Sequence, residues 1–236
     1  HRMMRLNKVI LSVISYIVVG SFQIVVWGQT ISGKIIDSEQ RPIEGVTIVL
    51  QTVDSIYIDA SISNADGIFT LNGQQEKYRL IIQHLLFHTK QVTGNGKNAG
   101  TIQLQPQDYA LDEVVVKAER PFVKVENGRL GYNLAVLSEK QVVNNAYEAL
   151  MRLPGVQESK GVLTLVGAGN LTVILNGKPT TMDVGQLETL LRNTPVNRVE
   201  KVEVMYSAPP EYHVRGAVIN VVLKRSNDYS FQGEVS

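Results

Sequence analysis

The sequence predicts a mainly β chain with two domains, a small antiparallel β-sandwich followed by an α+β domain. In the first half of the chain, six short β-rich segments are separated by turn residues, as in a small sandwich. The second half combines strand-like runs with two amphipathic helical segments, which is the pattern of an α+β domain. A length of 236 residues with 44% hydrophobic residues allows two cores of this size.

The N-terminus has the pattern of a secretory signal peptide. Three basic residues, the last of them Lys8, precede an apolar run from Val9 to Val26, and the small residue Gly28 follows. We therefore expect residues 1–28 to be a signal peptide cleaved after Gly28. A permanent transmembrane anchor is the alternative, because the apolar run is longer than a usual signal core.

Residues 29–105 are expected to form the sandwich. The connections between the strand segments, such as Asn64–Gly67 and Asn95-Gly96, contain residues that tolerate a positive φ. The expected strands are Thr30–Ile36, Val46–Gln51, Ile58–Ser63, Ile68–Leu71, Tyr78–Gln83 and Thr101–Leu104.

Strands of the second domain are indicated by alternation and by turn chemistry. From Val199 to Tyr206 apolar and polar residues alternate, which predicts a half-buried strand. Ala217–Leu223 is apolar almost throughout and is expected to be a central strand. Because Asn176-Gly177 is a dipeptide favoured in type I′ hairpin turns, the runs Val162–Val166 and Leu171–Leu175 are expected to pair.

Two helices are expected in the second domain. The first has Ser138 and Gln141 as a capping box and ends before Pro154. The second has Asp183 and Gln186 as its cap. Apolar residues repeat with helical period along both segments, so both apolar stripes are expected to be core rather than cofactor sites.

The succession of motifs in the second half resembles a known family. Across residues 125–225 the chain reads LPGV, NGKP, VEKVEV, PPEYHVRGA and INVVLKR, an order similar to that of the plug domain of TonB-dependent outer-membrane receptors of the Bacteroidetes type. The first half contains GKIID, RPIEGVTIVL and SNADGIFTL and resembles the carboxypeptidase-regulatory-like domain that often precedes such plugs.

This resemblance implies a fold and a function. Residues 124–225 would be the plug domain of a receptor for energised uptake of a small substrate, which the sequence does not identify. The protein would lie in the outer membrane with its N-terminal domains on the periplasmic side. A cell-envelope binding or adhesion module that does not transport is the alternative function.

Residues 106–123 are expected to be a linker with a partner-binding strand. A triple valine flanked by charge lies between two prolines, outside either domain, and is a strand without an obvious partner in the chain. It resembles the TonB box, which pairs with the C-terminal domain of TonB by strand addition. The alternatives are an edge strand packed on the sandwich, or a spacer. The box-like residues are Leu111, Asp112, Glu113, Val114, Val115 and Val116.

The last residues have the pattern of a membrane barrel strand. Tyr229, Phe231 and Val235 alternate with polar residues, as lipid-facing and lumen-facing positions do. We therefore expect residues 226–236 to begin a transmembrane β-barrel. One strand cannot close a barrel, so the remaining strands are expected in a longer protein, where they would surround the plug.

A loop between two predicted core strands is the candidate substrate contact. Glu211, Tyr212, His213 and Arg215 bring charged, aromatic and hydrogen-bonding groups into one short connection, and loops on a rigid scaffold often carry binding residues. The alternative is that this loop only packs against the barrel wall.

Composition and motifs argue against other function classes. The formal net charge is +1 without a basic stripe, so nucleic-acid binding is not expected. There is no cysteine, and the segment from His84 to His88 lacks the Glu of a zinc-protease motif. We expect no catalytic residue, cofactor or metal site, and hence no enzyme.

Overall fold

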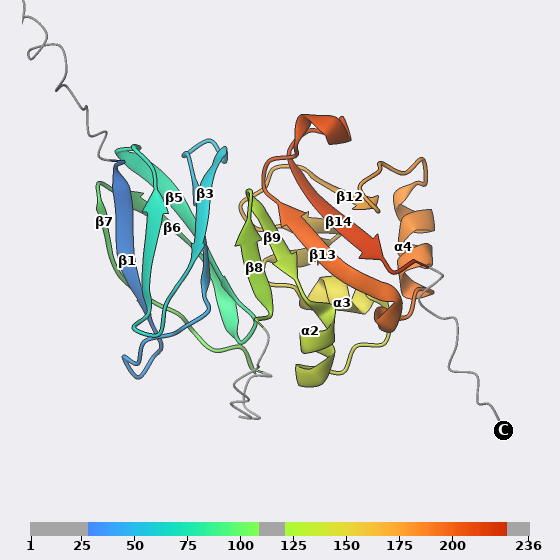
Figure 1. Ribbon diagram of the computed structural model, residues 1–236, viewed down its shortest axis with the longest axis horizontal. Helices are drawn as coiled ribbons and strands as arrows, with labels where there is room; N and C mark the ends of the chain where they lie inside the picture. Colours follow the sequence, from blue (N-terminus) through green and yellow to red (C-terminus); the bar gives the residue numbers. More distant parts are fainter. Residues whose placement is uncertain (1–27, 109–120, 226–236) are drawn as a thin grey trace, which may run out of the picture.

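The computed structural model describes residues 28–108 and 121–225, which form two mainly β domains side by side (Figure 1). Residues 1–27 of the predicted signal peptide, the TonB-box-like segment Leu111–Val116 and the predicted barrel strand at residues 226–236 lie outside the described residues. In the part that the structure describes, every helix is too short or too polar to cross a membrane.

The first domain is a sandwich of two sheets, with strand orders β4-β1-β7 and β3-β2-β5-β6. Between the sheets, aliphatic side chains and Phe69 and Tyr78 form its own core. The strands are β1 (Thr30–Ile36), β2 (Thr47–Gln51), β3 (Tyr57–Ile62), β4 (Ile68–Asn72), β5 (Lys77–His84), β6 (Phe87–Asn95) and β7 (Asn98–Gln103). The six expected strands are thus confirmed to within a few residues.

Two features of this sandwich differ from the expectation. Strand β6 was not predicted, because as an edge strand it alternates half-buried with exposed residues and is largely polar. The sandwich is also not wholly antiparallel, since β7 pairs in parallel with β1. After β6 the chain turns at Asn95-Gly96 and enters the other sheet instead of continuing the hairpin, so β7 runs beside the first strand in the same direction.

The second domain is built on a five-stranded mixed sheet with the order β12-β14-β13-β9-β8. Strand β14 pairs with neighbours on both sides and is fully buried over most of its length, which confirms it as a central strand. The domain contains strands β8 (Val123–Glu126), β9 (Arg129–Tyr132), β10 (Val156–Ser159), β11 (Val162–Leu165), β12 (Leu171–Leu175), β13 (Val199–Met205) and β14 (Ala217–Leu223).

The predicted pairing around Asn176-Gly177 is wrong, although the turn itself is present. Both residues have a positive φ, 49° and 73°, and the turn closes with hydrogen bonds between Leu175 and Lys178. The strand before the turn, β12, pairs in parallel with β14, whereas β11 pairs with β10 in a separate hairpin. Pro179 follows directly after Lys178, and the returning chain does not continue as a strand.

The first predicted helix is also wrong in its start. Two short helices occupy this region, α2 (Leu134–Lys140) and α3 (Ala146–Arg152), and the side chains of Asn133 and Asn145 cap them. Ser138 lies inside α2, where its hydroxyl donates to the Leu134 carbonyl oxygen. Each Asn accepts a backbone N–H of the first helical turn, so the chain starts its helices at these positions instead.

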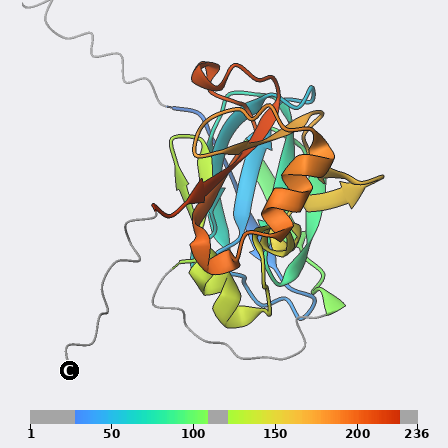
Figure 2. The same ribbon diagram turned by 90° about the vertical axis from the view of Figure 1, so that its right-hand side faces the viewer.

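The second predicted helix has the expected cap but a different face. Helix α4 (Val184–Arg192) begins with a complete capping box of Asp183 and Gln186. However, Val184 is 57% exposed and Leu190 is 38% exposed, so its apolar stripe is only partly core. Val142, predicted as core of the first helix, is 85% exposed. Helix α4 lies on the side of the second domain away from the sandwich (Figures 1 and 2).

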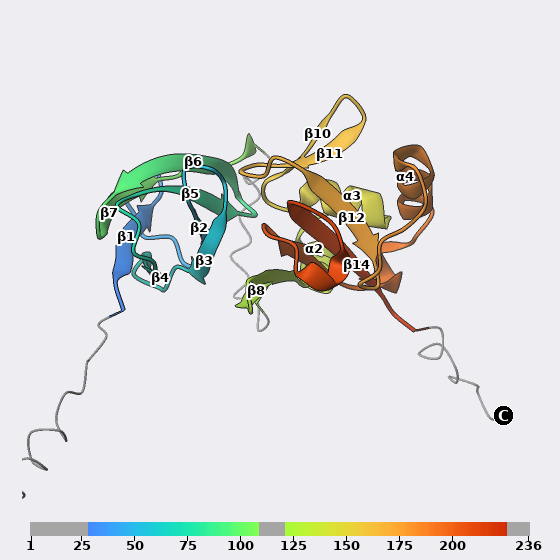
Figure 3. The ribbon, with the colours of Figure 1, turned by 90° about the horizontal axis from the view of Figure 1, so that it is seen from above.

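One hydrophobic core extends across both domains, in addition to the sandwich's own core. Val49, Ile81 and Leu85 of the sandwich belong to the same cluster of buried side chains as Tyr132 and Tyr206 of the second domain. Figure 3 shows sheet β3-β2-β5-β6 facing the second domain, with the β10–β11 hairpin projecting beside it. The sequence predicts a linker between the two domains at residues 106–123 and gives no indication of this contact.

Candidate functional site

The candidate loop from Ser207 to Gly216 joins the two central strands β13 and β14. It is closed by a hydrogen bond of 2.8 Å from the Ala208 N–H to the Gly216 carbonyl oxygen. Pro210 begins a 3₁₀ helix, η3 (Pro210–Tyr212), as its fixed φ allows. His213 then adopts a left-handed conformation with a φ of 52°, which ends the helix. The loop is therefore an ordered structure with defined ends.

Tyr212 is the anchor of this loop and is not an exposed binding residue. Its side chain is only 7% exposed. It belongs to a small cluster of buried side chains with Ile174, Met205 and Val218, which lies on the sheet face opposite the core shared with the sandwich. This cluster explains why β13 is buried on both faces near its end, rather than half-buried as its alternation predicted.

A charged network links the loop to the sheet. The Arg129 guanidinium lies 3.6 Å from Glu211 Oε1 and 3.7 Å from Glu203 Oε2, and its Cζ lies 5.8 Å from the centroid of the Tyr212 ring. The Asn220 amide donates to Glu203 Oε1 at 2.9 Å. These contacts hold Glu211 toward the protein, although its side chain is 61% exposed.

Two of the four predicted loop residues have exposed side chains and take no part in this network. His213 and Arg215 are exposed and lie two residues apart in the chain. The network residues Arg129, Glu203 and Asn220 were not predicted. The signal in the sequence was Asn220, a polar residue within the otherwise apolar run Ala217–Leu223, because a buried polar group requires a partner.

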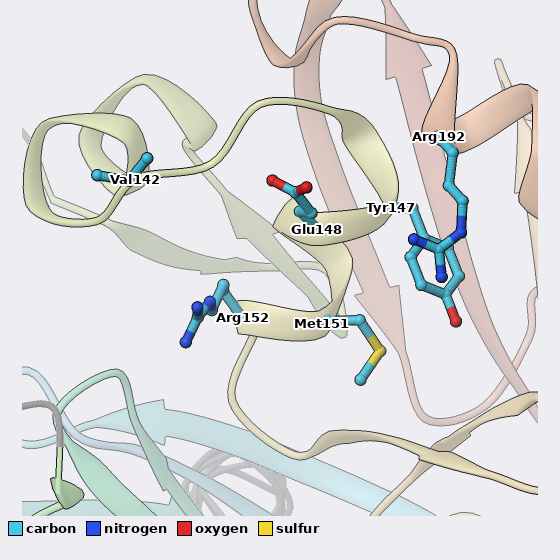
Figure 4. A pocket seen from close by; sticks show the side chains of 6 residues that line it. All are labelled: Val142, Tyr147, Glu148, Met151, Arg152 and Arg192. Carbon is cyan, nitrogen blue, oxygen red and sulfur yellow. The ribbon is translucent and has the colours of Figure 1, made fainter.

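A concave region lies between α3 and α4, with a volume of about 370 Å³ (Figure 4). The Arg192 Cζ lies 4.0 Å from the centroid of the Tyr147 ring, and Arg192 Nε donates to Glu188 Oε1 at 2.8 Å. The Tyr147 hydroxyl donates to Glu158 at 2.5 Å. Burial, together with this hydrogen bond, raises the pKa of Tyr147 to about 12, so the hydroxyl keeps its proton near neutral pH. The lining residues are Val142, Tyr147, Glu148, Met151, Arg152 and Arg192.

The polar groups of this region bind one another. Arg192 and Glu188 form an ion pair, and Glu148 accepts from the Asn144 backbone N–H, so these two charged residues of the lining have partners within the domain. This arrangement stabilises the contact between α3 and α4.

The described part of the chain contains no cluster of side chains that could hold a metal ion. Within residues 28–108 and 121–225, no three His, Asp or Glu side chains come together in a way that could hold an ion. His84 accepts the Leu86 backbone N–H and stacks edge-on against Phe87. Asn64 accepts two backbone N–H groups within its own turn.

Comparison with known proteins identifies the first domain. No curated protein sequence matches the chain. A 5-hydroxyisourate hydrolase of Klebsiella pneumoniae is 21% identical over 33% of this chain and 91% of its own, with a TM-score of 0.28. A type II cohesin–X-dockerin complex of Acetivibrio cellulolyticus is 21% identical over 34% of this chain and 60% of that one, with a TM-score of 0.28.

A catechol 1,2-dioxygenase of Acinetobacter radioresistens is 9% identical over 39% of this chain and 56% of its own, with a TM-score of 0.27. Similarities at this level carry no argument about function. The sequence itself matches the CarboxypepD_reg-like domain over residues 31–116, a range that includes the TonB-box-like residues Leu111–Val116. The chain therefore contains a CarboxypepD_reg-like domain at residues 31–116.

Proposed function

We propose that this chain is the N-terminal portion of a TonB-dependent outer-membrane receptor that takes up a small substrate with energy supplied through TonB. The observation that carries the proposal is the order of its parts. A CarboxypepD_reg-like domain, whose match ends with the segment Leu111–Val116, is followed by the motifs that resemble a plug domain. No group suited to catalysis is part of the proposal, and the function is binding and transport rather than an enzymatic reaction.

In this proposal the second domain, residues 124–225, is the plug. Its mixed sheet with a buried central strand and a rigid loop between β13 and β14 is compatible with that role. The barrel that surrounds a plug would follow from residues 226–236 onward. The sandwich and the TonB-box-like segment would then lie on the periplasmic side, where the C-terminal domain of TonB binds.

The exposed residues of the loop are the proposed substrate contacts. His213 and Arg215 provide an imidazole and a guanidinium on a loop that Tyr212 and Arg129 hold in place. Binding residues on a rigid support lose less conformational entropy when a ligand binds. Packing of the same side chains against a barrel wall remains the competing role.

The coupling step can be tested at Val115. Replacing Val115 with Pro removes a backbone N–H donor, and strand addition depends on backbone hydrogen bonds, so binding to the TonB C-terminal domain should fall at least tenfold. Val115→Ala keeps the donor and is the matched control, which should bind much more nearly like the natural chain. Titration calorimetry with the purified TonB domain measures both variants. Equal binding by the Pro and Ala variants would reject this segment as the TonB box.

A further inference from the structure

Strands β2 and β5 of the sandwich are buried on both faces. They pair with each other, and Val49 lies opposite Ile81 in that pairing. Ile48 and Ile82 point into the core of the sandwich itself, whereas Val49 and Ile81 belong to the core shared with the second domain. A sheet of an isolated sandwich would instead present one face to water. The face of this sheet that is turned away from the sandwich core is thus also buried, and the second domain covers it.

Buried polar side chains fix how the two domains meet. The Gln83 amide donates to the Tyr206 hydroxyl oxygen and accepts from the Tyr132 hydroxyl at 3.4 Å. Next to them, Gln51 Nε2 donates to the Gly167 carbonyl oxygen at 2.9 Å. All three residues of the first group are at least 96% buried, so any other domain orientation would leave their polar atoms without these partners.

Two glycines of the second domain allow the close approach. A Cβ at Gly155 would lie 2.5 Å from Gln83 Nε2, and a Cβ at Gly167 would lie 2.7 Å from Ile81 Cδ1. No side chain fits at either position without displacing a sandwich residue. The second domain therefore contacts the sandwich directly with its backbone.

We propose that the CarboxypepD_reg-like domain is an obligate structural partner of the second domain. The two domains unfold as one cooperative unit and hold a single relative orientation, which Gln83, Tyr132 and Tyr206 determine. The domain thus supplies part of the second domain's core, and a perturbation on one side of the interface is felt on the other. This inference rests on the interface alone and does not depend on the proposed transport function.

Hydrogen exchange measured by mass spectrometry on the full chain tests the cooperativity. The informative amides are the slowest ones of β5 in the sandwich and of β14 in the second domain, since these report global opening. Gly155→Ala places an alanine in a left-handed backbone conformation and also causes the clash with Gln83. Gly161→Ala is the matched control, because Gly161 has nearly the same φ, 77° against 79°, with open space around it.

For a single cooperative unit, both variants speed exchange in both domains. Backbone strain alone should accelerate exchange about tenfold for Gly161→Ala. Gly155→Ala should add about another tenfold, because a displaced Gln83 leaves buried hydroxyl groups unpaired. If either variant accelerates β14 while β5 keeps its natural rate, the domains are independent and the proposal is overturned.

A reciprocal pair on the sandwich side controls for damage confined to one domain. Ile81 and Ile82 are adjacent, equally buried and of the same type, but only Ile81 faces the second domain. Ile81→Ala should accelerate exchange in β14 as well as in β5. An acceleration of β5 alone by Ile81→Ala would also overturn the proposal, whatever Ile82→Ala does.

The orientation is measured by spin labels in a chain that contains no natural cysteine. Spin labels are attached to cysteines at two exposed positions, Glu44→Cys in the sandwich and Glu200→Cys in the second domain. Pulsed electron paramagnetic resonance should give one narrow distribution of the distance between the two labels. Adding Tyr206→Phe should broaden it, whereas Tyr78→Phe, within the sandwich, should not. A broad distribution in the otherwise natural chain would contradict a single orientation.

Discussion

The anchoring role of Tyr212 leads to a quantitative prediction for the candidate loop. Replacing a buried aromatic side chain with Ala typically costs about 3–5 kcal/mol. Tyr212 is 7% exposed and packs against Ile174, Met205 and Val218, so its loss should fall near the lower end of that range. The contact of its ring with Arg129 adds about 0.5–1 kcal/mol at a partly exposed site.

A destabilisation of about 3 kcal/mol should lower the melting temperature by roughly 6–12 °C for a chain of this size. Thermal unfolding followed by circular dichroism measures this effect. Tyr212→Phe keeps the ring and should melt close to the natural protein. Arg215→Ala changes an exposed side chain and should alter stability by no more than about 0.5 kcal/mol.

The result that would refute this reasoning is a Tyr212→Ala variant that melts within about 2 °C of the natural protein, a shift of less than roughly 1 kcal/mol. The loop would then not depend on its buried ring. The same data decide which variants can test substrate binding. A loss of ligand affinity in Tyr212→Ala would be ambiguous, whereas a loss in Arg215→Ala would report contact. At His213, Asn is the suitable replacement because it tolerates the left-handed backbone.

Three further predictions follow from the described contacts. Burial raises the pKa of Tyr132 and Tyr206 above the ordinary value of 10.0, so the stability that depends on their neutral hydroxyls is present below about pH 10 and is lost as the pH rises further. The part of the phenolate absorbance that is missing from a variant with Tyr132→Phe and Tyr206→Phe should therefore appear together with unfolding. Ionisation of these two residues without unfolding would contradict this prediction. Asp183→Ala removes the cap of α4 and should cost about 1 kcal/mol in urea unfolding, whereas Asp183→Asn should cost much less; equal losses would argue against the cap. Limited proteolysis should cut first between Pro106 and Pro121, and the two fragments should elute together because they share a core; separate elution would contradict that core.

Local sequence chemistry was sufficient for most elements of the fold. The sandwich strands follow from β-rich runs and turn residues, and the Asp183–Gln186 capping box marks the start of α4. The turn at Asn127-Gly128 joins β8 and β9, and both of its residues have a positive φ. These signals act over a few residues, so the local backbone preference is enough to predict them without knowledge of distant contacts.

The helix error shows how two local signals can compete. Ser138 and Gln141 have the spacing of a capping box, yet Asn133 and Asn145 are the residues that cap helices. In proteins most helical stability comes from packing of an apolar face, and here α3 buries Ala149 and Leu150 while Val142 is 85% exposed. The choice among possible caps was therefore made by packing rather than by the motif.

Strand pairing and the faces of strands were decided by tertiary structure. Nothing near Leu171–Leu175 indicates that its partner is β14, more than forty residues away, because pairing depends on which distant edge is free. The two-sided burial of β13 likewise depends on the loop that folds over Met205.

For the candidate site, the loop and the types of its side chains can be read from the sequence, whereas the roles of these side chains depend on the tertiary structure. Tyr212 became an anchor and Glu211 a partner of Arg129, whereas His213 and Arg215 were left exposed. The domain interface follows the same division. The apolar runs of β2 and β5 are visible in the sequence, but only the fold brings Gln83 to Tyr206, because residues far apart in a chain meet only where packing of the whole molecule places them.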